Sequence, residues 1–375
     1  MRIAFVADIT VPHVAELSEA LSHHGNDVTV YTRQTGRGSP REERAASGRR
    51  VVRVPAGPAA PEDPVRHAGP FARFLQDRWR ADPPDVVHAH AWLPGVAALS
   101  AARAAGVPLV ETFHALGVVE RRYGPVPAQR IGTERMLGRE ADRIAATSSD
   151  EVAELVRMGV PRPRISMVPS GVDTDLFVPE GECLPRDRFA HRLVSIGEPV
   201  PRNGFATAIA ALRALPDTEL VIACGSDTSR HEHARFLRSY AKSMGVARQV
   251  RLVGGVAGDE LPPLLRSADA AVCTPWYEPF GTVPLAAMAC GVPVVASAVG
   301  GPRDIVVDGV TGRLVPPRKP RALAGALQFL LGHRSLREQF GAAGRDRAWA
   351  RYSWDRVAKE TVRAYERCTT GGVVV

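Results

Sequence analysis

Residues Trp276–Gly291 read WYEPFGTVPLAAMACG, the most informative short pattern in the chain. This stretch follows Ala270–Thr274, an apolar run typical of a buried strand, and it ends in alanine-rich sequence that favours a helix. Pro279 and Gly281 turn the chain between the two. We therefore predict a strand, a turn and a helix whose first backbone amides suit an anion such as phosphate. On spacing alone, Glu278 could equally serve only as a cap of this turn.

The same alternation of strands and helices extends through the C-terminal half of the chain. The expected strands cover residues 191–196, 219–224, 250–253, 270–274 and 292–296. The expected helices cover residues 206–214, a segment through 238, 259–267, 283–289 and the stretch from 320 to about 368. Strands and helices in this order predict parallel βαβ units with right-handed crossovers.

The N-terminal half repeats this pattern. Its expected strands cover residues 2–8, 27–32, 51–54, 85–90, 108–113 and 143–147. Helices are expected over 13–24, over a segment ending near 79, over an alanine-rich segment through 105, and before the last of these strands. This half therefore predicts a second parallel sheet covered by helices.

Two domains agree with a length of 375 residues. Pro179–Asp187 (PEGECLPRD) is rich in proline, glycine and charge, which is typical of a linker. We expect an α/β chain of two Rossmann-like doubly wound domains, residues 1–180 and 188–350, with a C-terminal helix at 351–368 that returns to the first domain. Because doubly wound sheets bind ligands beyond the carboxyl ends of their strands, we expect the active site in a cleft between the domains.

Composition indicates a globular protein without a structural metal or disulfides. Hydrophobic residues make up 45% of the chain and charged residues 23%. The five cysteines are odd in number and never spaced as CxxC, which favours reduced thiols and a cytoplasmic location. The N-terminal sequence resembles a buried strand rather than a secretion leader, and no apolar run reaches the roughly 18 residues of a membrane span.

The net charge of +8 does not indicate nucleic-acid binding. Only three of the 48 basic residues are lysines, and no basic run is interleaved with aromatic residues. The charge is compatible with an anionic substrate or with peripheral contact to a membrane surface. The dinucleotide-binding GxGxxG, the P-loop and the GxSxG elbow are all absent, which disfavours dehydrogenase, P-loop nucleotidase and α/β-hydrolase functions.

Five segments in order resemble glycosyltransferase family 4, over nearly the whole chain. They are Asp85–Trp92 (DVVHAHAW), Thr112–Gly117 (TFHALG), Val168–Phe177 (VPSGVDTDLF), the EPFG segment, and Ala298–Val315 (AVGGPRDIVVDGVTGRLV). The resemblance implies a GT-B fold, with two Rossmann-like domains facing across a cleft. It also implies transfer of a sugar from a nucleoside diphosphate sugar to a hydroxyl group, with retention at the anomeric carbon and with no metal or cofactor. His88 and His90 share one face of a strand, and we expect them to be structural rather than metal ligands.

The resemblance assigns residues to three roles. The catalytic candidates are His114 and Glu278. The donor-binding candidates are Gly197, Glu198, Arg202, Asn203, Val256, Phe280, Gly281, Thr282, Val283 and Ala286. The acceptor-binding candidates are Asp8, His13 and Trp92.

Three positions depart from the family pattern on the path of the donor. Glu198 and Asn203 replace an arginine and a lysine that neutralise the phosphates, although Arg202 lies beside them. Ala286 replaces a glutamate that binds the two ribose hydroxyls. The turn after the first strand also lacks the usual glycine pair. These departures indicate a changed donor or the loss of donor chemistry.

The leading hypothesis is therefore a retaining glycosyltransferase that acts on a natural product, a cyclitol or an envelope glycolipid. The alternative is a non-catalytic GT-B homologue that acts as a binding or partner subunit. A sugar-processing epimerase of similar two-domain build is a third possibility, against which the EPFG segment argues.

Overall fold

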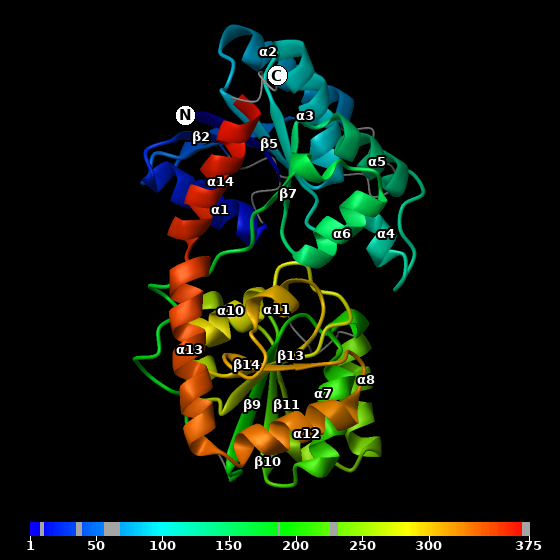
Figure 1. Cartoon of the computed structure of the whole chain (residues 1–375), viewed down its shortest axis with the longest axis vertical. Helices are drawn as coiled ribbons and strands as arrows, with labels where there is room; N and C mark the ends of the chain where they lie inside the picture. The colour runs from blue at the N-terminus through cyan, green and yellow to red at the C-terminus, as the bar shows by residue number, and fades with distance from the viewer. Residues whose placement is uncertain (8–10, 35–39, 56–67, 187, 226–231, 370–375) are drawn as a thin grey trace. The chain divides into compact units, whose positions relative to one another are not determined.

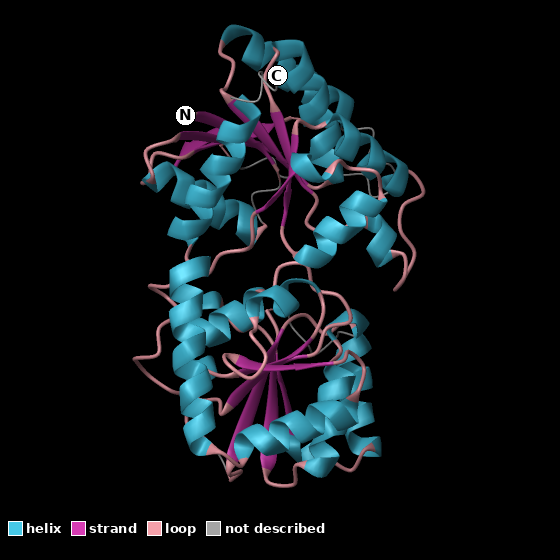
Figure 2. Cartoon of the chain, viewed as in Figure 1, coloured by secondary structure: helices cyan, strands magenta, loops and turns pink. Residues whose placement is uncertain are grey.

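The computed structural model describes residues 1–7, 11–34, 40–55, 68–186, 188–225 and 232–369. Its contacts divide the chain into two compact units (Figure 1). Unit 1 comprises Met1–Gly171 and Trp354–Val375, and unit 2 comprises Val172–Ser353. Each unit is a predominantly parallel sheet with helices packed against it (Figure 2), which confirms the predicted α/β class.

Unit 1 is built on eight strands in the order β3-β4-β2-β1-β5-β6-β7-β8. All neighbours are parallel except β3 and β4. The strands are β1 Arg2–Val6, β2 Asp27–Arg33, β3 Glu42–Arg44, β4 Arg50–Val54, β5 Val86–His90, β6 Leu109–Thr112, β7 Arg143–Ala146 and β8 Ile165–Met167. The helices are α1 Pro12–His23, α2 Ala68–Ala81, α3 Trp92–Ala105, α4 Gly117–Glu120, α5 Arg130–Glu140, α6 Ser149–Arg157 and α14 Trp354–Thr369.

The C-terminal helix α14 forms part of the core of unit 1. It packs beside α1, although the two helices lie at opposite ends of the sequence (Figure 1). Leu17 of α1 and Tyr365 of α14 are fully buried in one apolar cluster with Phe5 of β1. Burial of such side chains stabilises the fold by roughly 1.5–3 kcal/mol each.

Unit 2 is built on six parallel strands in the order β11-β10-β9-β12-β13-β14. The strands are β9 His191–Ile196, β10 Thr218–Ala223, β11 Val250–Val253, β12 Ala270–Cys273, β13 Val294–Ser297 and β14 Gly312–Val315. The helices are α7 Phe205–Ala211, α8 Glu232–Ser243, α9 Leu261–Arg266, α10 Thr282–Ala289, α11 Gly300–Ile305, α12 Pro320–Leu331 and α13 Arg334–Tyr352.

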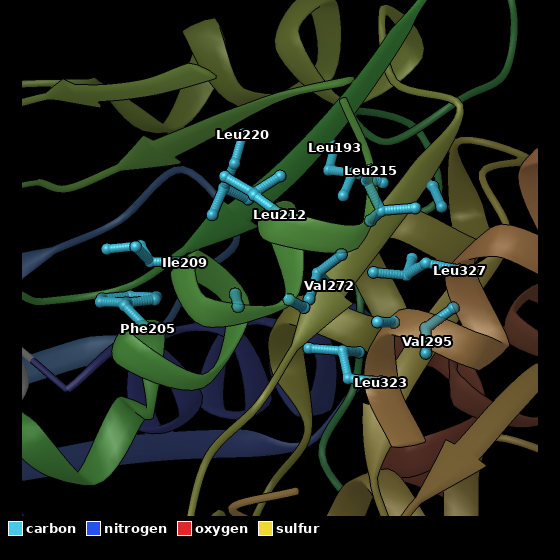
Figure 3. Close-up of a cluster of buried hydrophobic side chains, with 14 of the residues drawn as sticks. Leu193, Phe205, Ile209, Leu212, Leu215, Leu220, Val272, Val295, Leu323 and Leu327 are labelled. Carbon is cyan, nitrogen blue, oxygen red and sulfur yellow. The ribbon is translucent and has the colours of Figure 1, made fainter. Parts of the chain in front are cut away.

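The strands of unit 2 are apolar on both faces, as a parallel sheet covered by helices requires. Successive residues alternate between two buried clusters, so that Leu193 faces one cluster and Val194 the other. Figure 3 shows the first cluster, where Phe205 and Ile209 of α7 and Leu327 of α12 cover the sheet. The second cluster gathers apolar residues of α9, α10, α11 and α13.

The segment 179–187, expected to link the domains, lies in unit 2. Arg266 of α9 donates hydrogen bonds to the carbonyl oxygens of Val178 and Glu182, 3.1 and 2.8 Å long. The chain passes between the units at Gly171–Val172 and again at Ser353–Trp354. Among the described helices, none has both the length and the apolar character needed to span a bilayer.

Candidate active site

The EPFG segment forms the predicted turn between β12 and α10 in unit 2. Gly281 is the N-cap of α10 and has a φ of 71°, a left-handed conformation that favours glycine. Oε1 of Glu278 accepts hydrogen bonds from the backbone amides of Phe280 and Gly281, 3.1 and 3.2 Å long. The capping role left open by the sequence is therefore present, and contact with a donor sugar stays a prediction.

The remaining amides at the start of α10 belong to Thr282 and Val283. The first bond of the helical ladder runs from Leu285 N to Gly281 O at 3.2 Å, so these two amides precede the ladder. The positive end of the helix dipole adds to their attraction for an anion. The amides of Phe280 and Gly281 thus hold Glu278, and those of Thr282 and Val283, after Gly281, lie at the start of the helix.

Helix α11 begins with Gly300 and Gly301, which pack against the turn. Gly301 of α11 donates its amide to the carbonyl oxygen of Glu278 at 2.8 Å. A Cβ atom on Gly301 would lie 2.7 Å from the nitrogen of Gly281, closer than van der Waals contact allows. The turn therefore requires glycine on both sides of the contact.

A cavity of about 30 Å³ adjoins this turn, enough for about one water molecule. Its lining includes three of the predicted site residues, Asn203, Glu278 and Val283. The other lining residues are Ser195, Ile196, Phe205, Cys273, Thr274, Pro275, Pro284 and Pro302.

The loop after β9 carries two of the departures from the family pattern, Glu198 and Asn203. The side-chain amide of Asn203 donates to the carbonyl oxygen of Glu198 at 2.7 Å, which closes the loop on itself. Trp276 donates its backbone amide to the carbonyl oxygen of Arg202 at 2.8 Å, which ties the loop to the EPFG segment. Arg202 is exposed, whereas Gly197 beside the loop is partly buried.

Most of the predicted donor residues, Val256 and Ala286 among them, do not line the cavity. Val256 follows β11 and donates its amide to Cys224 O at 3.1 Å. Ala286 lies on α10, is 9% exposed and belongs to the second apolar cluster.

Unit 1 gathers four histidines near the carboxyl ends of β5 and β6. Nδ1 of His90 lies 2.9 Å from Nε2 of His114. His13 packs edge-on against His114, with ring centroids 5.5 Å apart, and His88 packs against His90 at 4.1 Å. His114 is partly exposed, whereas the other three are buried.

The surroundings keep all four imidazoles neutral near pH 7. Burial, with a contribution from His114, lowers the pKa of His88 to about 3. Burial lowers the pKa of His114 to about 4. The pKa values of His13 and His90 are lowered well below 6.5, first by burial and then by neighbouring histidines. His114 therefore offers a neutral hydrogen-bonding group rather than a cation.

The structure brings the rings of His13 and His114 together, and their roles toward acceptor and donor stay predictions. Trp92 is the first residue of α3 and is 8% exposed. The predicted Asp8 lies outside the described residues. Among the residues that the structure describes, no cluster of histidine, cysteine or acidic side chains is arranged to hold a metal ion.

Sequence reasoning missed several neighbours of this cluster. His13 lies 3.4 Å from the hydroxyl of Ser170 and 5.4 Å, between ring centroids, from Trp354. Arg130 and Glu134 of α5 bind the backbone just after His114. Ser170 lies within the Val168–Phe177 segment and the others lie outside the quoted segments, and no local pattern relates any of them to His13 or His114.

Comparisons with known families match both halves of the chain. A model described as Glycosyltransferase Family 4 matches residues 11–176. A second model, described as Glycosyl transferases group 1, matches residues 190–347. The two matches together span most of both units.

Individual proteins resemble the chain over nearly its full length. It is 33% identical over 383 residues to the D-inositol 3-phosphate glycosyltransferase of Xylanimonas cellulosilytica, over 95% of this chain and 91% of that protein. Sucrose-phosphate synthase from Thermosynechococcus elongatus aligns with a TM-score of 0.87 and 27% identity, over 99% of this chain and 100% of that one. HepE from Anabaena, solved with UDP and glucose, shares the fold at a TM-score of 0.76 and 20% identity, over 98% of this chain and 99% of that one.

Proposed function

The chain belongs to glycosyltransferase family 4, retaining enzymes of GT-B fold that use nucleotide sugars, and on that premise we propose that it glycosylates a hydroxyl group of a phosphorylated cyclitol. The observation that carries the donor half of this proposal is the EPFG turn of unit 2. There, Glu278 is held in place by the amides of Phe280 and Gly281.

The donor would bind to unit 2 at this turn. The diphosphate would take the open amides of Thr282 and Val283, and the exposed guanidinium of Arg202 would supply positive charge in place of the missing cations. Glu278 would accept hydrogen bonds from hydroxyls of the donor sugar. HepE, solved with UDP and glucose and also with UDP-glucose, supports a nucleotide-sugar donor by its likeness to this chain.

Retention needs no covalent nucleophile in the mechanism that we propose. The leaving phosphate would deprotonate the acceptor hydroxyl on the face from which it departs. The protein would then contribute by orienting both substrates and by stabilising charge on the departing diphosphate. His114, neutral because of its lowered pKa, would offer a hydrogen bond without repelling a cation-like sugar in the transition state.

The names of two relatives support the choice of a phosphorylated cyclitol as the acceptor. The protein from Xylanimonas cellulosilytica is named a D-inositol 3-phosphate glycosyltransferase, and so is a protein from Geodermatophilus obscurus that is 34% identical over 94% of this chain and 83% of its own length. We therefore name D-inositol 3-phosphate as the first acceptor to test, before a natural product or a glycolipid. Unit 1, which carries His13 and Trp92, would bind it.

One observation favours a second candidate, a binding subunit without turnover. Asn203 uses its side-chain amide to hold the backbone of Glu198, so the loop after β9 is shaped by a neutral residue and carries a carboxylate. A carboxylate on the path of a diphosphate opposes binding of the donor.

Release of nucleoside diphosphate tests the proposal and separates the two candidates. Uridine and deoxythymidine diphosphate sugars would each be incubated with D-inositol 3-phosphate, with unphosphorylated inositol, or without acceptor. We expect release at least 10-fold faster with D-inositol 3-phosphate than without acceptor, and retained configuration in the NMR spectrum of the product. Nucleotide binding without acceptor-dependent release would favour the binding subunit, and turnover only with another acceptor would overturn the cyclitol.

A further inference from the structure

The loop that carries His114 has an unusual backbone conformation. His114 has a φ of 61°, in the left-handed region that residues other than glycine rarely adopt. The chain turns tightly there, with Ala115 N only 2.7 Å from Phe113 O. Such a conformation is strained and persists only where surrounding contacts fix it.

Two side chains of α5 fix this loop from opposite directions. Arg130 donates through Nη2 to the carbonyl oxygen of Ala115 at 2.7 Å. Glu134 accepts from the amide of Gly117 at 2.8 Å through Oε2. One donor and one acceptor therefore hold the carbonyl and the amide that follow His114, in the stretch where neither belongs to a strand.

The two side chains also hold each other. Nε of Arg130 donates to Oε1 of Glu134 at 2.7 Å, and Nη1 donates to Oε2 of Glu120 at 2.6 Å. Glu134 is fully buried, and the side chain of Arg130 is 14% exposed. A rigid guanidinium that uses three of its nitrogens in this way has little freedom to move.

The packing leaves no room between the loop and α5. A Cβ atom on Gly117 would lie 3.2 Å from each of three atoms on α5: Cγ of Arg130, Oε2 of Glu134 and Cγ1 of Ile131. The contact is thus a direct approach of backbone to ion pair.

We propose that Arg130 and Glu134 are positioning residues, which hold the loop 114–117 so that the His114 ring meets His90. The ring is fixed at its other end by the 2.9 Å contact between His90 Nδ1 and His114 Nε2. The catalytic consequence rests on the role of His114 in the proposed function, whereas the placement of the ring does not.

The test compares Glu134→Gln with Glu154→Gln. Glu154 is a matched control because it is also buried, at 8% exposure, and is also paired with two arginines, Arg122 and Arg157. Glu134→Gln keeps the shape of the side chain and removes its charge. NMR of ¹³C-labelled histidine, with the His114 signal assigned by its loss in His114→Asn, would give the pKa of His114 in each protein.

The pKa of His114 is about 4 in the native chain because the ring is buried. A loosened loop in Glu134→Gln would admit water to the ring, so we expect this pKa to rise by at least 1 unit there and to stay unchanged in Glu154→Gln. We also expect kcat for release of nucleoside diphosphate to fall at least 10-fold in Glu134→Gln, with the donor KM changed less than 3-fold, and to fall less than 2-fold in the control. Arg130→Lys, which keeps a cation beside Glu134 but loses the bond to Ala115, should show the same pattern and serves if Glu134→Gln does not fold.

An unchanged His114 pKa in both Glu134→Gln and Arg130→Lys would overturn the inference. A raised pKa with unchanged kcat would show that Arg130 and Glu134, the clamp on the loop, position His114 without consequence for catalysis. It would overturn the catalytic part of the inference. If the native protein showed no turnover, the proposed function would fail by itself, and the NMR comparison would still decide whether the clamp holds the ring.

Discussion

Replacement of His88 by glutamine should change how the stability of unit 1 depends on pH. His88 is 1% exposed, and its ring nitrogens lie 2.7 Å from the Tyr365 hydroxyl and 2.9 Å from the Thr112 hydroxyl. Its pKa is lowered from 6.5 to about 3, first by burial and then by His114. Between pH 6.5 and pH 3, His88 is therefore protonated in the unfolded chain and neutral in the folded chain. This histidine thus destabilises the fold as the pH falls towards 3.

The magnitude follows from these two pKa values. At pH 5, which is 1.5 units below the pKa of 6.5, protonation stabilises the unfolded chain by about 2 kcal/mol, whereas His88 in the folded chain stays neutral. Glutamine does not titrate. Relative to the native chain, the free energy of unfolding of His88→Gln should therefore rise by about 2 kcal/mol between pH 8 and pH 5, whatever its fixed cost at pH 8.

Hydrogen exchange in increasing urea, followed by mass spectrometry on peptides of unit 1, measures this difference without assuming that both units unfold together. The comparison with the native chain is needed because buried carboxyl groups such as Glu111, whose pKa is raised by burial and by Glu134, titrate in the opposite sense. A difference between the two proteins that stays constant within about 0.5 kcal/mol from pH 8 to pH 5 would contradict a buried, neutral His88.

Three further changes have defined outcomes. Glu111→Gln removes a buried carboxyl group whose oxygens both lack a hydrogen-bond partner in the described structure. It should therefore raise the free energy of unfolding at pH 8, by an amount that shrinks towards pH 5, because burial raises the pKa of Glu111. Equal gains at both pH values in urea unfolding would show that Glu111 is not protonated in the fold. Gly301→Ala should destabilise unit 2 by about 1–3 kcal/mol and weaken nucleotide binding, because its Cβ would press on the Phe280 backbone; a native melting temperature with native affinity for uridine diphosphate in calorimetry would rule out this contact. Ala286→Glu should favour uridine over 2′-deoxyuridine diphosphate by roughly 10-fold or more if residue 286 faces the ribose, and an unchanged ratio in calorimetry would remove it from the donor site.

The sequence predicted most strands of unit 2. The expected strand at 250–253 coincides with β11, and α10 begins one residue before the expected helix. In unit 2 it missed α11 and β14, which have weak local signals. Helix α11 reads GGPRDI, in which two glycines and a proline oppose a helix, and its first turn is held instead by packing on Glu278. Strand β14 has four residues and is defined by pairing with β13, which no local pattern reveals.

The sequence named candidate residues for the site but not the contacts between them. The sequence placed His114 at the end of a strand and suggested His13 as an acceptor residue, and the structure brings their rings together. The partner of His114, His90, had been interpreted only as structural, since period-two spacing says which face a side chain takes but not what it meets. Arg130 and Glu134 form an ordinary i,i+4 pair in sequence, and only the folded chain shows that their free atoms reach the loop after His114.

The most direct test of the central claim, that the EPFG turn of unit 2 binds the donor for transfer, is turnover by Glu278→Gln. Glutamine keeps an oxygen that can accept from Phe280 and Gly281, so the turn and the melting temperature should be preserved. Loss of a charged hydrogen bond to the donor costs about 1.5–3 kcal/mol, which predicts a 10- to 150-fold slower release of nucleoside diphosphate. Native turnover in Glu278→Gln, at a native melting temperature, would contradict the placement of the donor at this turn.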